Sequence, residues 1–158
     1  MQSLKMVLGI ILVPLALTGC ATFHKQDTTT LRIHEQVSSA LPPEDAMGVT
    51  IPLADLTMSV SPFPTLTEKN VLSAELYATS GGEAILVRFD IHGTIILDEA
   101  TTRTRGQYLV TFINNRPVAA WLVNQRILNG QFLVEGDFTD DEAKKVVDAL
   151  NKMGKTNR

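Results

Sequence analysis

The segment from residue 127 to 143, ILNGQFLVEGDFTDDEA, strongly limits the fold because turn, strand and helix signals follow one another without a gap. Gly130 completes an Asn-Gly pair of the kind found in tight turns. Phe132 to Glu135 is a short run of strand type, and Gly136 closes it. A helix start then follows directly, so we expect a turn, a strand and a helix in immediate succession.

The helix start has the spacing of a capping box. Thr139 can accept a hydrogen bond from the main chain of Glu142, whose carboxylate can bind the main-chain N–H of Thr139. The apolar residues that follow recur at helical spacing, as in an amphipathic helix: Ala143, Val146, Val147 and Leu150. We expect Gly154 to end this helix.

Alternating apolar and polar residues bounded by turn residues predict four further strands: 71–79, 83–91, 107–113 and 117–123. Gly81-Gly82 joins the first two into a hairpin. Asn114-Asn115 joins the last two, because asparagine tolerates the left-handed conformation that a tight hairpin turn needs.

The segment 94–105 predicts the first helix, with Ile95, Ile96 and Ala100 facing inward and Gly106 ending it. The preceding segment 31–65 has weak strand signals interrupted by prolines. This order of strands and helices favours an α+β fold, a mainly antiparallel sheet with two helices packed on one face.

The N-terminus has the pattern of a signal peptide. Lys5 gives a positive charge, and the apolar run from Met6 to Leu17 is shorter than the roughly 20 residues that span a bilayer. Leu17-Thr18-Gly19-Cys20 resembles the lipobox of bacterial lipoproteins, at which the chain is cut before a cysteine that receives lipid. We therefore expect residues 1–19 to be a lipoprotein signal peptide and Cys20 to be lipidated; an ordinary secretory peptide is the alternative.

The resemblance to lipoproteins implies attachment to the membrane through the lipid at Cys20. The polar residues 20–30 predict a tether to the folded part. Residue 21 is alanine, whereas aspartate at that position retains many lipoproteins at the inner membrane. We thus expect a lipid-anchored protein of the bacterial cell envelope, at the outer membrane and facing the periplasm.

Composition excludes several classes of function. The chain has 158 residues and a net charge of −3, which argues against nucleic-acid binding. The histidines His24, His34 and His92 lack metal-site spacing, and the acids near Thr139 are typical of a helix start. No serine has an assigned base, so we expect no enzyme, no cofactor and no metal.

The stretch from Leu66 to Gly154 resembles the head of the first periplasmic domain of SecD, the accessory protein of the Sec translocon. Three segments carry the resemblance: LTEKNVLSAELYATSGGEAILVRFDIHG, TTRTRGQYLVTFINNRPVAAWLVNQRI and LNGQFLVEGDFTDDEAKKVVDALNKMG. It divides the chain into an N-terminal extended segment, 31–65, and a SecD-head-like domain, 66–158. Trp121 departs from the family, in which proline is common there.

SecD proteins carry transmembrane helices that couple proton flow to movement, and this chain shows none after the predicted cleavage. The resemblance therefore implies a periplasm-facing binding or accessory module that contacts translocated polypeptide or an envelope protein, without motor activity. The alternative is a structural lipoprotein that docks to a fixed envelope assembly. Fold resemblance alone does not separate the two.

The candidate contact residue is Trp121, which by strand alternation shares a face with Ala119 and Val123, opposite Val118. Tryptophan is a common anchor at interfaces. A core position is the other interpretation, since both faces of this strand are apolar.

Overall fold

The computed structural model describes residues 29–42 and 44–156. In chain order its strands and helices are β1 Leu31–Val37, β2 Met47–Ile51, β3 Leu56–Val60, β4 Leu66–Thr67, β5 Val71–Thr79, β6 Gly82–Phe89, α1 Ile91–Arg103, β7 Tyr108–Ile113, β8 Arg116–Leu122, β9 Gln131–Val134 and α2 Asp140–Thr156. Two single turns of 3-10 helix, Pro52–Ala54 and Glu68–Asn70, precede β3 and β5. Every strand pair among these described residues is antiparallel.

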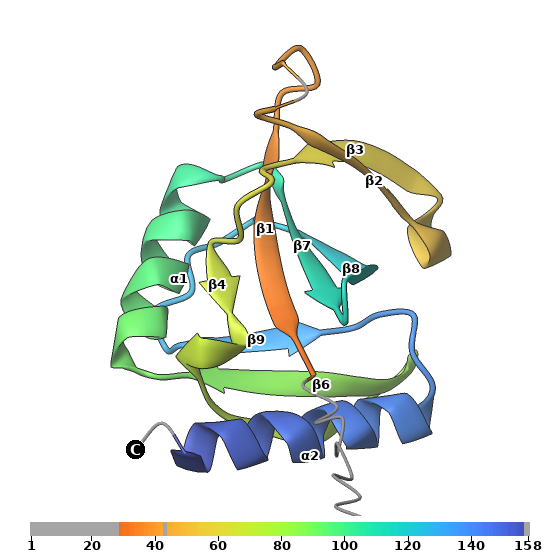
Figure 1. The fold of residues 1–158 in the computed structure, drawn as a ribbon, viewed down its shortest axis with the longest axis vertical. Coiled ribbons are helices and arrows are strands. Elements are labelled where there is room, and N and C mark those ends of the chain that lie inside the picture. The colour runs from red at the N-terminus through yellow and green to blue at the C-terminus, as the bar shows by residue number, and fades with distance from the viewer. Residues whose placement is uncertain (1–28, 43, 157–158) are drawn as a thin grey trace, which may run out of the picture.

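The strands form two sheets (Figure 1). The larger has the order β2-β3-β1-β7-β8, with the short β4 also paired to β1. β1 is central because it pairs with β3, β4 and β7. The segment 31–65 therefore contributes to the same sheet as the residues that follow it.

The smaller sheet has the order β5-β6-β9, and α2 lies along it next to β5 (Figure 1). Asn151 of α2 holds the outer edge of β5: its Oδ1 accepts from the Ala74 N–H at 2.9 Å, and its Nδ2 donates to the Ala74 carbonyl at 2.8 Å. This side chain satisfies main-chain groups that an edge strand otherwise exposes.

The main core lies between the two sheets and the helices, and apolar side chains of β1, β6, β8, β9 and α2 fill it. A second, smaller core forms where the β2–β3 hairpin packs against Val110 and Phe112 of β7. The larger sheet thus contributes apolar side chains to two separate cores.

The first helix begins three residues earlier than the sequence predicts. Asp90 caps it by accepting a hydrogen bond from the Gly93 N–H at 2.6 Å, so the helix starts at Ile91. Ala100 is buried as expected, but the inward prediction for Ile95 is wrong because that side chain is 53% exposed. The buried face of this helix consists of Gly93, Leu97, Ala100 and Thr101, and Ile95 lies outside it.

The capping box of α2 is confirmed: Thr139 N–H donates to Glu142 at 2.9 Å, and Glu142 N–H donates to the Thr139 hydroxyl at 3.3 Å. The prediction that Gly154 ends this helix is wrong, because α2 continues to Thr156. A Cβ at Gly154 would lie 2.5 Å from the Leu72 carbonyl oxygen. Glycine is present here because the helix approaches the main chain of β5 closely.

The α+β class with antiparallel pairing and two helices is confirmed. The structure adds that the strands divide between two sheets. The predicted signal peptide, 1–19, lies outside the described residues.

Candidate functional site

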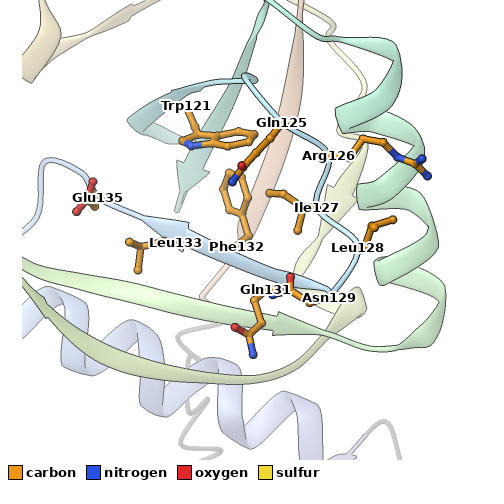
Figure 2. Close-up of a pocket in the computed structure, with 10 residues that line it drawn as sticks. All are labelled: Trp121, Gln125, Arg126, Ile127, Leu128, Asn129, Gln131, Phe132, Leu133 and Glu135. Atoms are coloured by element: carbon orange, nitrogen blue, oxygen red, sulfur yellow. The ribbon is translucent and has the colours of Figure 1, made fainter.

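A cavity of about 450 Å³ opens between β8 and β9, which belong to different sheets (Figure 2). The two strands meet where the Asp137 N–H donates to the Val118 carbonyl at 2.9 Å. Gly136 permits this approach, since a Cβ there would lie 2.6 Å from the Val118 oxygen. Farther from this junction the two strands form no pairs, and the cavity occupies the space between them.

Two aromatic side chains line the cavity. Trp121 of β8 projects toward Phe132 of β9, and their rings meet edge to face with centroids 5.7 Å apart (Figure 2). Phe132 is buried, whereas Trp121 is half-buried and packs on the main core. Such a pair gives the cavity an apolar lining with one accessible ring.

The structure places the three predicted contact residues differently. Ala119 and Val123 are buried in the main core, and only Trp121 lines the cavity. Both earlier interpretations of Trp121 therefore describe part of its environment: one portion packs on the core and another faces the cavity.

The prediction that Val118 points away from Ala119 is wrong. The pairing register between β7 and β8 shifts at Thr111 and Phe112, which leaves Val118 as an extra residue. Both Val118 and Ala119 consequently belong to the main core. Such a bulge breaks the simple alternation of strand side chains.

The loop between β8 and β9 forms the rim of the cavity. Arg126 is held by two hydrogen bonds to the Asp98 carboxylate, at 2.8 and 2.9 Å, and the Ile127 N–H donates to the Thr101 hydroxyl at 3.1 Å. These contacts fix the loop to α1. The rest of the rim is polar at Gln125 and apolar at the exposed Leu128.

Sequence reasoning did not find Phe132 or the loop 125–128 as parts of a site. Phe132 reads as an ordinary buried strand residue, and the loop has no motif. The only sequence signal is Trp121 itself, the single tryptophan of the chain. Its partner becomes apparent only when the two sheets are placed together.

The acids near Thr139 have structural partners. Arg116 lies 3.0 Å from Asp137 and 3.8 Å from Glu142. The main-chain hydrogen bond from Thr139 lowers the pKa of Glu142, and the nearby charge of Arg116 adds to this effect. Among the described residues, no three histidine, cysteine or acidic side chains are grouped to hold a metal ion.

His34 is buried in β1, next to the second core. Its Nδ1 lies 2.8 Å from the Ser61 carbonyl oxygen, which can only accept, so Nδ1 carries the donated proton. The ring lies 4.8 Å from that of Phe112. Burial lowers the pKa of His34, which favours the neutral form.

A second hollow, of about 600 Å³, lies where α1 starts beside β5. It is mostly apolar, and Ile91 at its border is 84% exposed. Leu72 and Ile95 also line it and are exposed. This surface was not predicted, because the sequence suggested that Ile95 faces inward.

A family model, the P1 head subdomain of SecDF, matches residues 51–152. This match covers more than half of the chain. The chain belongs to the SecDF P1 head family. The resemblance to SecD that the sequence indicated is thereby confirmed, and the cavity between β8 and β9 lies within a SecDF head domain.

Solved SecDF structures support the fold of this head domain. One, described as a membrane component SecDF that enhances protein export, has a TM-score of 0.63 and 19% identity over 78% of this chain. A second, SecDF in a super-membrane-facing form, has a TM-score of 0.63 and 20% identity over 78% of this chain. The matches span 62% and 19% of those two chains. No curated protein sequence matches this chain.

Within residues 29–42 and 44–156, no helix combines the length and apolar character needed to cross a membrane. The predicted lipid site, Cys20, lies outside the described residues. Lipidation at Cys20 and attachment to the outer membrane therefore stay predictions.

Proposed function

We propose that this protein is a lipid-anchored, periplasm-facing accessory module that contacts translocated polypeptide through the cavity between β8 and β9, without motor activity of its own. Trp121 is the anchor residue of this contact. The observation that carries the proposal is the accessible indole of Trp121 above Phe132, in a head domain of the SecDF family. A SecDF of similar fold is described as enhancing protein export.

The physical character of the cavity suits a chain that is still unfolded. Its lining is apolar at the aromatic pair and at Leu128, while Gln125 and Glu135 supply polar groups at its border. An unfolded polypeptide exposes both apolar side chains and main-chain groups, so it can use both kinds of surface.

Site-specific photo-crosslinking in intact cells tests this proposal. A photoreactive residue at Gln125, on the rim of the cavity, should capture proteins during export. The same residue at Lys144, on the exposed surface of α2, serves as the matched control. Blocking export should abolish capture at Gln125, because the source of unfolded chains is then removed.

The expected result is many products at Gln125 that depend on export, and few at Lys144. Equal capture at both positions, or capture at Gln125 that persists when export is blocked, would contradict the proposal. Trp121→Ala should reduce capture at Gln125, whereas Leu122→Ala should leave it unchanged. Leu122 is the adjacent residue of β8, is 45% exposed and does not line the cavity.

A second candidate is docking to a fixed envelope assembly, and the apolar hollow beside β5 favours it. The hollow is lined by three exposed apolar side chains, Leu72, Ile91 and Ile95. An exposed apolar patch of this kind is typical of a protein–protein interface. A photoreactive residue at His92, between these side chains, should then give one product in fixed stoichiometry. That product should not depend on export, which separates the two candidates.

A further inference from the structure

The outer edge of β9 has unpaired main-chain groups that face the cavity. β9 pairs with β6 on one side, with Val87 opposite Phe132 and Leu86 opposite Leu133. On its other side β9 has no strand partner among the described residues. The cavity borders this side, since Leu133 and Glu135 both line it.

The hydrogen-bond pattern shows which residues face the open side. Phe89 N–H donates to the Gly130 carbonyl at 2.9 Å, so Gly130 faces β6. Main-chain groups of an antiparallel strand alternate between its two edges. Phe132 and Val134 therefore also face β6, whereas the N–H and carbonyl of Leu133 point toward the open edge.

The other edge strand of this sheet, β5, has a side chain bound to its outer main-chain groups. On β5 the side chain of Asn151 binds both the N–H and the carbonyl of Ala74. On β9 the Asn129 side chain accepts from the Gln131 N–H at 3.1 Å, and no described residue binds the main chain of Leu133. The outer edge of this sheet is thus bound at Ala74 of β5 and unbound at Leu133 of β9.

The strand on the other side of the cavity, β8, also lies at the edge of its sheet. The Val123 N–H donates to the main-chain carbonyl of Gln107, just before β7, at 2.9 Å. The main chain of Val123 therefore faces β7, and the main chain of Leu122 faces away from it. Beyond the hydrogen bond between the Asp137 N–H and the Val118 carbonyl, β8 and β9 diverge and do not pair with each other. Of β8 only Trp121 lines the cavity, so β9 is the strand edge that an added chain can pair with there.

Charge at the rim favours a cationic ligand. The guanidinium of Arg126 is already bound by Asp98. Glu135 is exposed and has no ion-pair partner among the described residues. A free carboxylate beside an apolar lining suits an extended segment that carries lysine or arginine next to apolar side chains.

We infer that an extended polypeptide binds here as an added β-strand on β9, with main-chain hydrogen bonds to Leu133, an apolar side chain against Trp121 and a basic side chain at Glu135. This inference rests on the proposed function and specifies its binding mode. Main-chain pairing gives affinity for many sequences, since every residue except proline carries the same donor and acceptor.

Hydrogen exchange of the purified protein tests this binding mode. The probe is a short capped peptide in which leucine alternates with threonine between terminal lysines. Saturating peptide should slow exchange of the Leu133 amide by about tenfold or more, because a new hydrogen bond protects it. The Val134 amide, already paired with β6, should change little. Peptide binding is followed independently through the fluorescence of Trp121.

A proline substitution tests the same bond from the protein side. Leu133→Pro removes the outward N–H and leaves the ladder to β6 intact, so the protein should stay folded. The peptide should then bind about tenfold more weakly or worse. Leu133→Ala, the matched control, also shortens the side chain but keeps the N–H, so it should bind the peptide more tightly than Leu133→Pro.

The outcomes separate the two proposals. If the peptide binds but the Leu133 amide keeps its exchange rate, strand addition is wrong while polypeptide contact stands. If the peptide and other unfolded chains do not bind at all, the proposed function itself fails. Should Leu133→Pro unfold the protein, the exchange measurement on the unchanged protein still decides.

Discussion

The rings of Trp121 and Phe132 meet at an interplanar angle of 82° although they come from strands of different sheets. Phe132 belongs to β9 of the smaller sheet, and Trp121 to β8 of the larger one. The pair connects the two sheets near the cavity and keeps part of the indole accessible. One contact thus serves both the fold and the candidate site.

Trp121→Ala should lower the free energy of unfolding by about 2 kcal/mol and leave the protein folded. Removing a fully buried large aromatic side chain costs about 3 to 5 kcal/mol, and Trp121 is only half-buried. Urea unfolding followed by circular dichroism measures the change. Leu122→Ala, the adjacent exposed residue, should change stability by less than about 0.5 kcal/mol. Equal losses in both variants would show that the aromatic pair does not hold the sheets together.

Gly154→Ala should destabilise the protein by about 1 to 3 kcal/mol, because the added Cβ would lie 2.5 Å from the Leu72 carbonyl oxygen. Helix propensity alone predicts the opposite sign, a gain of about 1 kcal/mol. Thermal unfolding decides between them. Gly48→Ala is the control, because nothing lies within 4 Å of a Cβ at that position.

Stability should fall as pH drops from 7.5 to 5.5, through the effect of burial on His34. Burial holds the pKa of His34 below 6.5, its ordinary value, and the charge of Arg32 acts in the same direction. The unfolded chain therefore binds the proton first, and stability is lost as pH falls through 6.5 toward the lower folded pKa. Urea unfolding at both pH values measures this loss.

The control for this pH dependence is His34→Gln, whose amide can still donate to the Ser61 carbonyl but does not titrate. This variant should show a smaller loss of stability between pH 7.5 and 5.5. An unchanged loss would assign the pH dependence to other groups.

Cys20→Ala should release the protein from the membrane fraction, because lipid at Cys20 is the predicted anchor. Fractionation of cells, with the mass of the mature N-terminal peptide, measures the change. Ala21→Asp, which keeps the cysteine, should stay membrane-bound and shift toward the inner membrane. Membrane attachment of a processed Cys20→Ala variant would contradict the lipoprotein prediction.

Local signals predicted the turns and the second helix start correctly because they depend on neighbouring residues. Asn114 and Asn115 have φ of 52° and 64°, the left-handed values that their sequence suggested. The capping box of Thr139 and Glu142 likewise involves residues within one turn.

Long-range pairing could not be predicted in the same way. β1 pairs with β7 across a large separation in sequence, and alternation within β1 gives no information about its partner. The register shift at Val118 and the close approach at Gly154 have the same origin, since each depends on a distant main chain. The candidate site could not be predicted for the same reason, because Phe132 and Trp121 come into contact only when the two sheets pack together.

The fluorescence of Trp121 tests most directly whether unfolded polypeptide contacts this side chain, because Trp121 is the only tryptophan in the chain. The titrant is an unfolded polypeptide that lacks tryptophan, with the same polypeptide in its folded state as the control. We expect a saturable shift of the emission to shorter wavelength with the unfolded form alone, as the indole becomes covered. Binding of the unfolded form, measured by calorimetry, without any change in Trp121 emission would contradict it.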